Sequence, residues 1–159
     1  MPRIKLITYI NSSREVVFDL SRSIELHKIS TKKTKEKVIA GKMTGLIELN
    51  ESATWRAKHL GFYQELTSKI IEYNYPEYFV DEMQKGAFKN FRHEHYFFEE
   101  TTEGVKMVNV FEYESPFGFL GKLIDKIFLE KYMVKLLLER NRVIKEFAET
   151  NLWKKILPA

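Results

Sequence analysis

The fold is decided by the stretch FGFLGKLIDKIFLEKYMVKLLLERNRVIKEFAE, residues 117–149. It contains no proline, and its apolar residues recur at spacings of three and four, the pattern of an amphipathic helix. About thirty helical residues extend over roughly 45 Å, at a rise of about 1.5 Å per residue. The sequence therefore predicts one long C-terminal helix that can cover a whole sheet. Its predicted inward face consists of Leu120, Leu123, Ile124, Ile127, Val134, Leu137, Leu138 and Ile144.

The chain that precedes this helix has the pattern of a sheet. A first strand is predicted over residues 4–10, and six further strands follow one another after residue 43 with short breaks between them. Short connections favour antiparallel neighbours. The six later strands are predicted at residues 44–49, 53–60, 62–73, 77–83, 88–100 and 105–114.

Between the first strand and the others, the chain is predicted to be helical. Ser12 and Glu15 have the spacing of a capping box and are expected to open a short helix. Residues 23–40 are predicted to hold a second short helix and a charged loop. An apolar helix face and an apolar sheet face each need a partner. We therefore expect one α+β domain over residues 1–159, a curved seven-stranded antiparallel sheet wrapped around the long helix.

Composition excludes several classes of function. The 159 residues include no cysteine, which removes disulfides, thiolate metal sites and cysteine nucleophiles. The net charge is +4, but the basic residues are spread among 22 acidic ones, so nucleic acid is not expected as a partner. No window approaches eighteen unbroken apolar residues, which predicts no membrane span. The first residues lack the apolar core of a secretory signal, and we expect a cytoplasmic location.

The alternation of side chains along the predicted strands indicates which residues face inward. In FRHEHYFFEE, residues 91–100, the two histidines share one side with phenylalanines, while charged residues occupy the other side. The same argument on the neighbouring strands and the helix gives a set of candidate ligand-binding residues. They are Trp55, His59, Phe79, Asp81, His93, His95, Phe97, Met107, Asn109, Phe111, Tyr113, Ile124 and Ile127.

Several local patterns resemble the START and polyketide-cyclase-like superfamily (SRPBCC), whose helix-grip fold is shared with the birch pollen allergens. They are VVFDL at residues 16–20, ATWRAKHLG at 53–61, QELTSKI at 64–70, YFVDEMQKGAFKNFRHEH at 78–95 and YESPFGFLGKLIDKIFLEKYM at 113–133. The segment that leads into the last helix, PFGFLG, is the most specific. The resemblance covers essentially the whole chain and is to the ligand-binding, largely uncharacterised branch. It implies a deep cavity between sheet and helix that holds lipids, sterols, polyketides or other apolar molecules.

Three functions remain open for the inward polar residues. The first is a binding module in which a few polar groups orient an apolar ligand, or simply bond one another in the core. The second is a cyclase or dehydrase in which His93, His95 or Asp81 acts as general base. The third is a metal site, but a histidine pair two residues apart is a weak signal. We expect no metal and no cofactor, and binding without catalysis is favoured.

The remaining partner expectations concern surfaces. The end of the chain, with Trp153, Lys154 and Lys155, either packs onto the body or contacts an anionic membrane surface. Exposed parts of the last helix offer a contact for another protein or for a second copy, so both a monomer and a homodimer are compatible with the sequence. The expected partner is a small hydrophobic ligand.

Overall fold

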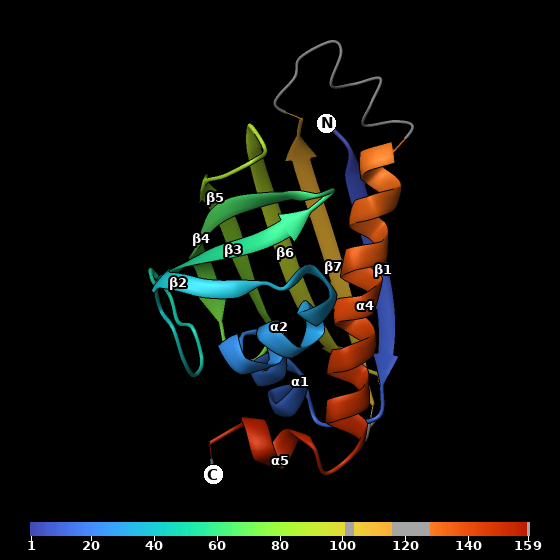
Figure 1. Cartoon of the computed structure of the whole chain (residues 1–159). Helices are drawn as coiled ribbons and strands as arrows, with labels where there is room; N and C mark the ends of the chain where they lie inside the picture. The colour runs from blue at the N-terminus through green and yellow to red at the C-terminus, as the bar shows by residue number, and fades with distance from the viewer. Residues whose placement is uncertain (101–103, 116–127, 159) are drawn as a thin grey trace.

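The computed structural model describes residues 1–100, 104–115 and 128–158. Within these residues, seven strands form one antiparallel sheet in the order β1-β7-β6-β5-β4-β3-β2. The sheet curls around the helices (Figure 1), so the predicted fold class is confirmed. The strands are β1 (Arg3–Ile10), β2 (Lys37–Gly41), β3 (Ser52–His59), β4 (Phe62–Asn74), β5 (Tyr78–Lys85), β6 (Asn90–Glu99) and β7 (Val105–Glu114).

The helices lie on the concave side of the sheet. They are α1 (Arg14–Ser21), α2 (Ile24–Ser30), the 3-10 turn η1 (Lys32–Thr34), α4 (Glu130–Glu149) and α5 (Trp153–Ile156). In Figure 1, α4 runs along the sheet, and α1 and α2 lie beside its C-terminal half. Each short helix is opened by a serine whose side chain accepts a backbone N–H, Ser13 for α1 and Ser23 for α2. The cap of α1 is thus Ser13 and not the predicted Ser12.

Two further sequence predictions need correction or fall outside the described chain. The second strand is Lys37–Gly41 and not residues 44–49. The segment 44–49 instead meets the start of α2, where the Gly45 N–H donates to the Glu25 carboxylate and Leu46 forms an isolated bridge with Ser23. Strand β2 is a short edge strand of five residues with a bulge between Val38 and Ala40, so its side chains do not alternate regularly enough to be recognised from the sequence. The predicted helical residues 117–127 lie outside the described residues.

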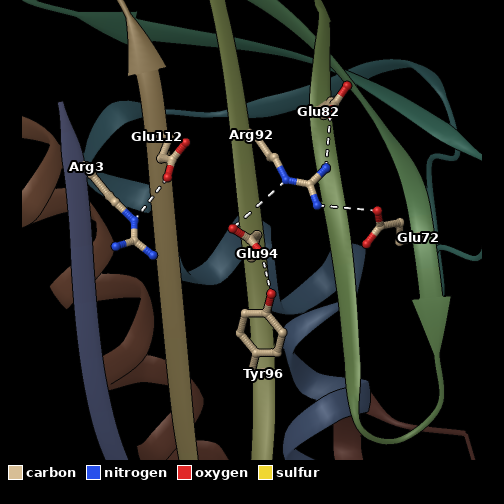
Figure 2. Close-up of polar contacts among 7 residues, drawn as sticks. All are labelled: Arg3, Glu72, Glu82, Arg92, Glu94, Tyr96 and Glu112. Carbon is tan, nitrogen blue, oxygen red and sulfur yellow. Dashed lines mark hydrogen bonds and ion pairs between the residues drawn. The ribbon is translucent and has the colours of Figure 1, made fainter. Parts of the chain in front are cut away.

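The alternation of β6 separates an inner apolar face from an outer charged one. His93 and His95 are 7% and 2% exposed, and they share their face with the buried Phe91 and Phe97. Figure 2 shows the opposite face, where Arg92 lies among the carboxylates of three glutamates. The Arg92 guanidinium is 3.2 Å from Glu82, 3.4 Å from Glu72 and 4.0 Å from Glu94. Exposed ion pairs of this kind each contribute about 0.2–1 kcal/mol, so the outer face adds little stability.

Helix α4 closes the core through a stripe at helical spacing. Leu137, Ile144 and Ala148 are buried against the sheet and the short helices, and each large apolar side chain buried there stabilises the fold by about 1.5–3 kcal/mol. Leu138, predicted on the same face, is 51% exposed because it lies one residue, or 100°, away from that stripe. None of the described helices is long and apolar enough to cross a membrane.

The hairpin between β3 and β4 has an unusual turn. His59 pairs with Phe62, which leaves a two-residue loop of Leu60 and Gly61, and both have positive φ, 54° and 86°. Two-residue hairpin loops with two positive φ angles strongly prefer Asn-Gly or Asp-Gly, because a bulky residue in the left-handed region costs roughly 1–2 kcal/mol. Leu60 is also 53% exposed, so burial does not offset this cost.

We expect Leu60→Asn to stabilise the protein by about 0.5–1 kcal/mol, because asparagine tolerates the left-handed conformation and leucine does not. Equilibrium denaturation with urea, compared with wild type, measures the difference. A loss of stability would show that the Leu60 side chain makes a compensating contact.

Candidate functional site

A cavity of about 180 Å³ lies between the concave face of the sheet, α2 and α4. Its walls are mainly apolar, and polar side chains gather in two places. The apolar lining consists of Ile24, Ile47, Ala53, Trp55, Leu66, Ile70, Phe79, Phe88, Phe91, Phe111, Met133 and Leu137. The ionisable residues that line it are Arg22, His27, Glu36, Asp81, His93, His95 and Arg140.

A chain of hydrogen bonds runs from the cavity wall through the sheet into α4. His95 Nε2 is 2.8 Å from Asp81 Oδ1, and Asn109 Nδ2 is 3.1 Å from His95 Nδ1. Asn141 of α4 then donates its side-chain N–H groups to Asn109 Oδ1 at 3.0 Å and to Thr8 Oγ1 at 3.3 Å. This chain satisfies buried polar groups on four adjacent strands and ties them to one residue of the helix.

The hydrogen-bond chain determines the protonation of His95. Because Asn109 donates to Nδ1, the proton of the neutral ring lies on Nε2 and is donated to the Asp81 carboxylate. Burial, and then the nearby Arg140 cation, keep the pKa of His95 well below its usual value. Burial likewise lowers the pKa of His93 and raises that of Asp81. Both histidines are therefore neutral at neutral pH.

Two residues that line the cavity each carry a polar atom without a hydrogen-bond partner. Three buried side-chain atoms of the described residues lack one; His93 Nε2 and Arg140 Nη1 belong to cavity residues, whereas Arg14 Nε does not. The other Arg140 nitrogen, Nη2, donates to the backbone carbonyl of Ser21 at 2.7 Å, which fixes the guanidinium at the end of α1. Burial lowers the pKa of Arg140 to about 10, and Asp81 opposes this shift, so the side chain stays charged at neutral pH. A buried donor left unpaired costs about 1–3 kcal/mol, and a ligand atom can supply the missing partner.

The second polar group of the cavity wall is a histidine–glutamate pair. His27 Nε2 is 2.7 Å from Glu36 Oε1, and the His27 ring lies against Trp55 with 4.0 Å between the ring centroids. Burial raises the pKa of Glu36, but the contact with His27 outweighs this and the pKa is lowered. His59, predicted with the ligand-binding set, instead bonds through Nδ1 to the Tyr132 hydroxyl at 2.7 Å.

Asp81, His93 and His95 could also contribute ligands to a metal ion, since their candidate donor atoms all lie within 4.8 Å of one another. Two histidines and a carboxylate are a common zinc set. However, a divalent cation here would face the Arg140 guanidinium in the same cavity, and His95 Nε2 already donates to Asp81. The group is therefore better suited to the oxygen atoms of an organic ligand. The absence of a metal stays a prediction.

The structure brings only part of the predicted ligand-binding set to the cavity. Trp55, Phe79, Asp81, His93, His95 and Phe111 line it. Phe97, Met107 and Tyr113 are at most 1% exposed and belong to the packed core, while Asn109 lies behind His95. Ile124 and Ile127 lie outside the described residues. Trp153 packs against the core, in agreement with one of the two alternatives for the end of the chain.

The residues predicted from the sequence do not include Arg140 and Asn141, the two polar residues by which α4 reaches the site. Arg140 lies three residues after Leu137 and four before Ile144, and Asn141 lies four after Leu137 and three before Ile144. The helical spacing of the apolar stripe would have placed both on the inner face. Polar residues on an apolar face are the signal that could have found them.

No protein-family profile matches the sequence, and a search of curated proteins found no match. Solved structures do resemble this one. The Thermus thermophilus protein TTHA0849 has a TM-score of 0.74 at 21% identity, over 91% of this chain and 95% of that one. A START superfamily protein from Mycobacterium smegmatis has a TM-score of 0.69 at 11% identity, over 92% and 97%. Major latex-like protein 151 from Panax ginseng has a TM-score of 0.67 at 13% identity, over 94% and 98%.

The chain has the helix-grip fold. The resemblance that the sequence analysis identified is thereby confirmed at the level of the fold. In this helix-grip protein, the cavity lies between the sheet and α4, as the resemblance implied.

We expect Asn141→Leu to destabilise the helix-grip protein by about 1–3 kcal/mol, because it leaves Asn109 Oδ1 buried without a donor. Urea denaturation measures the loss. The matched control is Arg142→Leu, one residue further along the same helix, whose side chain is 60% exposed; its effect should stay within about 0.5 kcal/mol. Equal effects of the two changes would contradict a structural role for the hydrogen-bond chain.

Stability should fall as the pH decreases from about 6.5 towards 5. In this range the unfolded chain protonates His93 and His95 while the folded protein, in which both pKa values are lowered, does not. Each histidine then contributes a slope of up to about 1.4 kcal/mol per pH unit. Asp81 has the opposite effect on stability at lower pH. Its pKa is raised in the folded protein, so the folded protein takes up this proton before the unfolded chain does, and stability increases as the pH falls.

Urea denaturation at a series of pH values measures this slope, and His93→Phe provides the comparison. His93 makes no hydrogen bond through Nε2, so the variant should fold and lose the part of the slope that His93 contributes, which leaves a shallower dependence on pH from His95 and from His59, whose pKa is also lowered by burial. A stability that is independent of pH over this range in the wild type would show that the histidines titrate alike in the folded and unfolded chains.

Proposed function

We propose that the protein binds a small amphipathic molecule in the cavity between the sheet and α4, with a polar oxygen at Arg140 and His93. The observation that carries this proposal is the pair of buried, unpartnered atoms, Arg140 Nη1 and His93 Nε2, on two residues that line a mainly apolar cavity. Ligand pockets are typically apolar with a few placed polar groups that orient the ligand. Buried polar atoms without partners are rare in folded proteins, which supports a ligand as their partner.

The charge of the site indicates which end of the ligand binds there. Arg140 can only donate hydrogen bonds, so the ligand must present an acceptor such as a carbonyl or carboxylate oxygen. The carboxylate of Asp81 is already bonded to His95 and leaves the free Arg140 nitrogen available. A charge-assisted hydrogen bond in a site shielded from water contributes more than one at the surface.

The volume indicates the size of the ligand. At about 180 Å³ the cavity is smaller than the roughly 300–1,000 Å³ typical of sites for drug-sized molecules. Engineered apolar cavities of about 150 Å³ bind benzene. A ligand with a short chain or a single ring therefore suits the cavity better than a sterol or an entire lipid.

An acid–base enzyme is the second candidate, favoured by the neutral His93 ring. Its unpartnered Nε2 could take a proton from carbon beside a carbonyl group, while Arg140 Nη1 stabilises the oxygen of the resulting enolate. Asp81, 4.0 Å from His93 Nδ1, would stabilise the imidazolium formed. Incorporation of deuterium from heavy water into a bound ketone, lost in His93→Phe, would distinguish catalysis from binding alone.

We expect Arg140→Met to weaken the binding of hexanoate by roughly tenfold or more, because a charge-assisted hydrogen bond contributes about 1.5–3 kcal/mol. The binding of hexanol, which carries no charge, should change much less. Isothermal titration calorimetry with both ligands measures the difference, and native mass spectrometry of freshly purified protein identifies any molecule that is already bound.

Arg142→Met is the matched control for this experiment. Arg142 lies two residues further along α4 but bonds Glu139 and Glu146 on the exposed face. Its loss should leave the affinity for hexanoate unchanged. Equal weakening by the two changes, or a wild type that prefers hexanol, would contradict a polar anchor at Arg140.

A further inference from the structure

The β3–β4 hairpin ends in a projecting apolar tip, residues 60–63. Leu60 is 53% exposed, Phe62 72% and Tyr63 55%. A methyl group added at Gly61 would meet no atom within 4 Å, so the turn stands clear of the described protein. Leu60 occupies a left-handed position that favours asparagine or glycine. A residue that breaks both the conformational preference and the rule against exposed apolar side chains indicates a functional role.

The start of α4 adds a further apolar side chain to the tip. His59, the last residue before the turn, is held by the Tyr132 hydroxyl at 2.7 Å. Phe128, one turn before Tyr132, stacks on that ring with 6.4 Å between the centroids and is 50% exposed. The hydrogen bond and the ring stack of Tyr132 thus connect Phe128 to the turn that carries Leu60 and Phe62. We refer to Leu60, Phe62 and Phe128 as the tip patch.

Basic side chains and a tyrosine lie beside the tip patch, on the opposite face of the same hairpin. The Arg56 guanidinium lies 4.6 Å and the Lys58 ammonium 5.8 Å from the centre of the Tyr63 ring. Both cations are exposed, as is Glu65, which pairs with Arg56 across the strands. Tyrosine, lysine and arginine next to apolar side chains are the residues that anchor proteins at the interface between water and lipid.

The tip patch lies on the same face of the hairpin as the cavity. Trp55 pairs with Leu66, and both line the cavity, while His59 pairs with Phe62 four residues closer to the turn. Side chains at even spacing along a strand share a face. The row of side chains that begins in the cavity wall therefore ends at Phe62.

From these observations we propose that the tip patch docks onto the surface of a lipid bilayer, with its three apolar side chains among the acyl chains and the cations at anionic headgroups. A bilayer accepts a few inserted side chains, whereas a stable protein interface needs about 800 Å² on each partner, more than a hairpin tip offers. The proposed docking does not depend on the proposed ligand. If both proposals hold, the face of the hairpin that carries Phe62 and lines the cavity provides a path for an amphipathic molecule between membrane and cavity.

The test is co-sedimentation with large vesicles of phosphatidylcholine, with and without phosphatidylglycerol. The wild type should bind, more strongly to the anionic vesicles and less strongly as salt increases. Leu60→Asn and Phe62→Ser should each weaken binding by roughly tenfold, since each removes an exposed apolar side chain that the bilayer would bury. Leu60→Asn is especially informative, because the same change is expected to stabilise the fold.

Phe98→Ser is the matched control, since Phe98 is 48% exposed on β6, outside the hairpin; its vesicle binding should equal that of the wild type. Failure of the wild type to bind either vesicle, or equal binding by all variants, would overturn the proposal. So would light scattering that shows a dimer lost on Phe62→Ser, because the tip would then contact a second copy. Hexanoate affinity without vesicles should be unchanged by Leu60→Asn, which separates this proposal from the ligand site.

Discussion

The hydrogen-bond chain from Asp81 through His95, Asn109 and Asn141 to Thr8 is the constraint on which the arrangement of sheet and helix depends. Apolar packing alone tolerates small shifts of a helix along a sheet, because one aliphatic side chain can replace another. A buried polar chain does not tolerate them, since each member loses its partner when the helix moves. Asn141 therefore determines where α4 lies on the strands, and with it the position of Arg140 in the cavity.

The cavity combines an apolar wall with opposite charges that are only partly paired. Arg140 is fixed by the Ser21 carbonyl on one side, and Asp81 is bonded to His95 on the other. Each residue has a structural partner, yet the arginine keeps one free nitrogen. This division lets the fold hold a buried cation without a ligand, and it leaves one nitrogen free for the ligand that we propose. The outer face in Figure 2 differs, because there Arg92 is shared among three glutamates in contact with water.

The sequence predicted the position of a side chain correctly where a single periodicity determines which side chains are buried. Alternation along β5 and β6 placed Asp81, His93 and His95 on one face, because a sheet covered on only one side separates its side chains with a period of two. It failed for β2, because a strand of five residues with a bulge is too short to show a regular alternation. On α4 the apolar stripe was recognised, but Arg140 and Asn141 were not assigned to it because they are polar. The partners of both lie far away in the sequence, so their pairing could not be derived from local spacing.

The two arginines of α4, only two residues apart, have opposite environments. Arg140 lies in the cavity, whereas Arg142 is solvated and bonded to glutamates of its own helix. An inserted or deleted residue turns the rest of a helix by about 100°. Such a change between Met133 and Arg140 would carry the buried guanidinium out of the cavity and break the contacts of Asn141 in one step. During evolution this segment can therefore change by substitution but not in length, and related cavities should be recognisable from the unvarying distance between these positions.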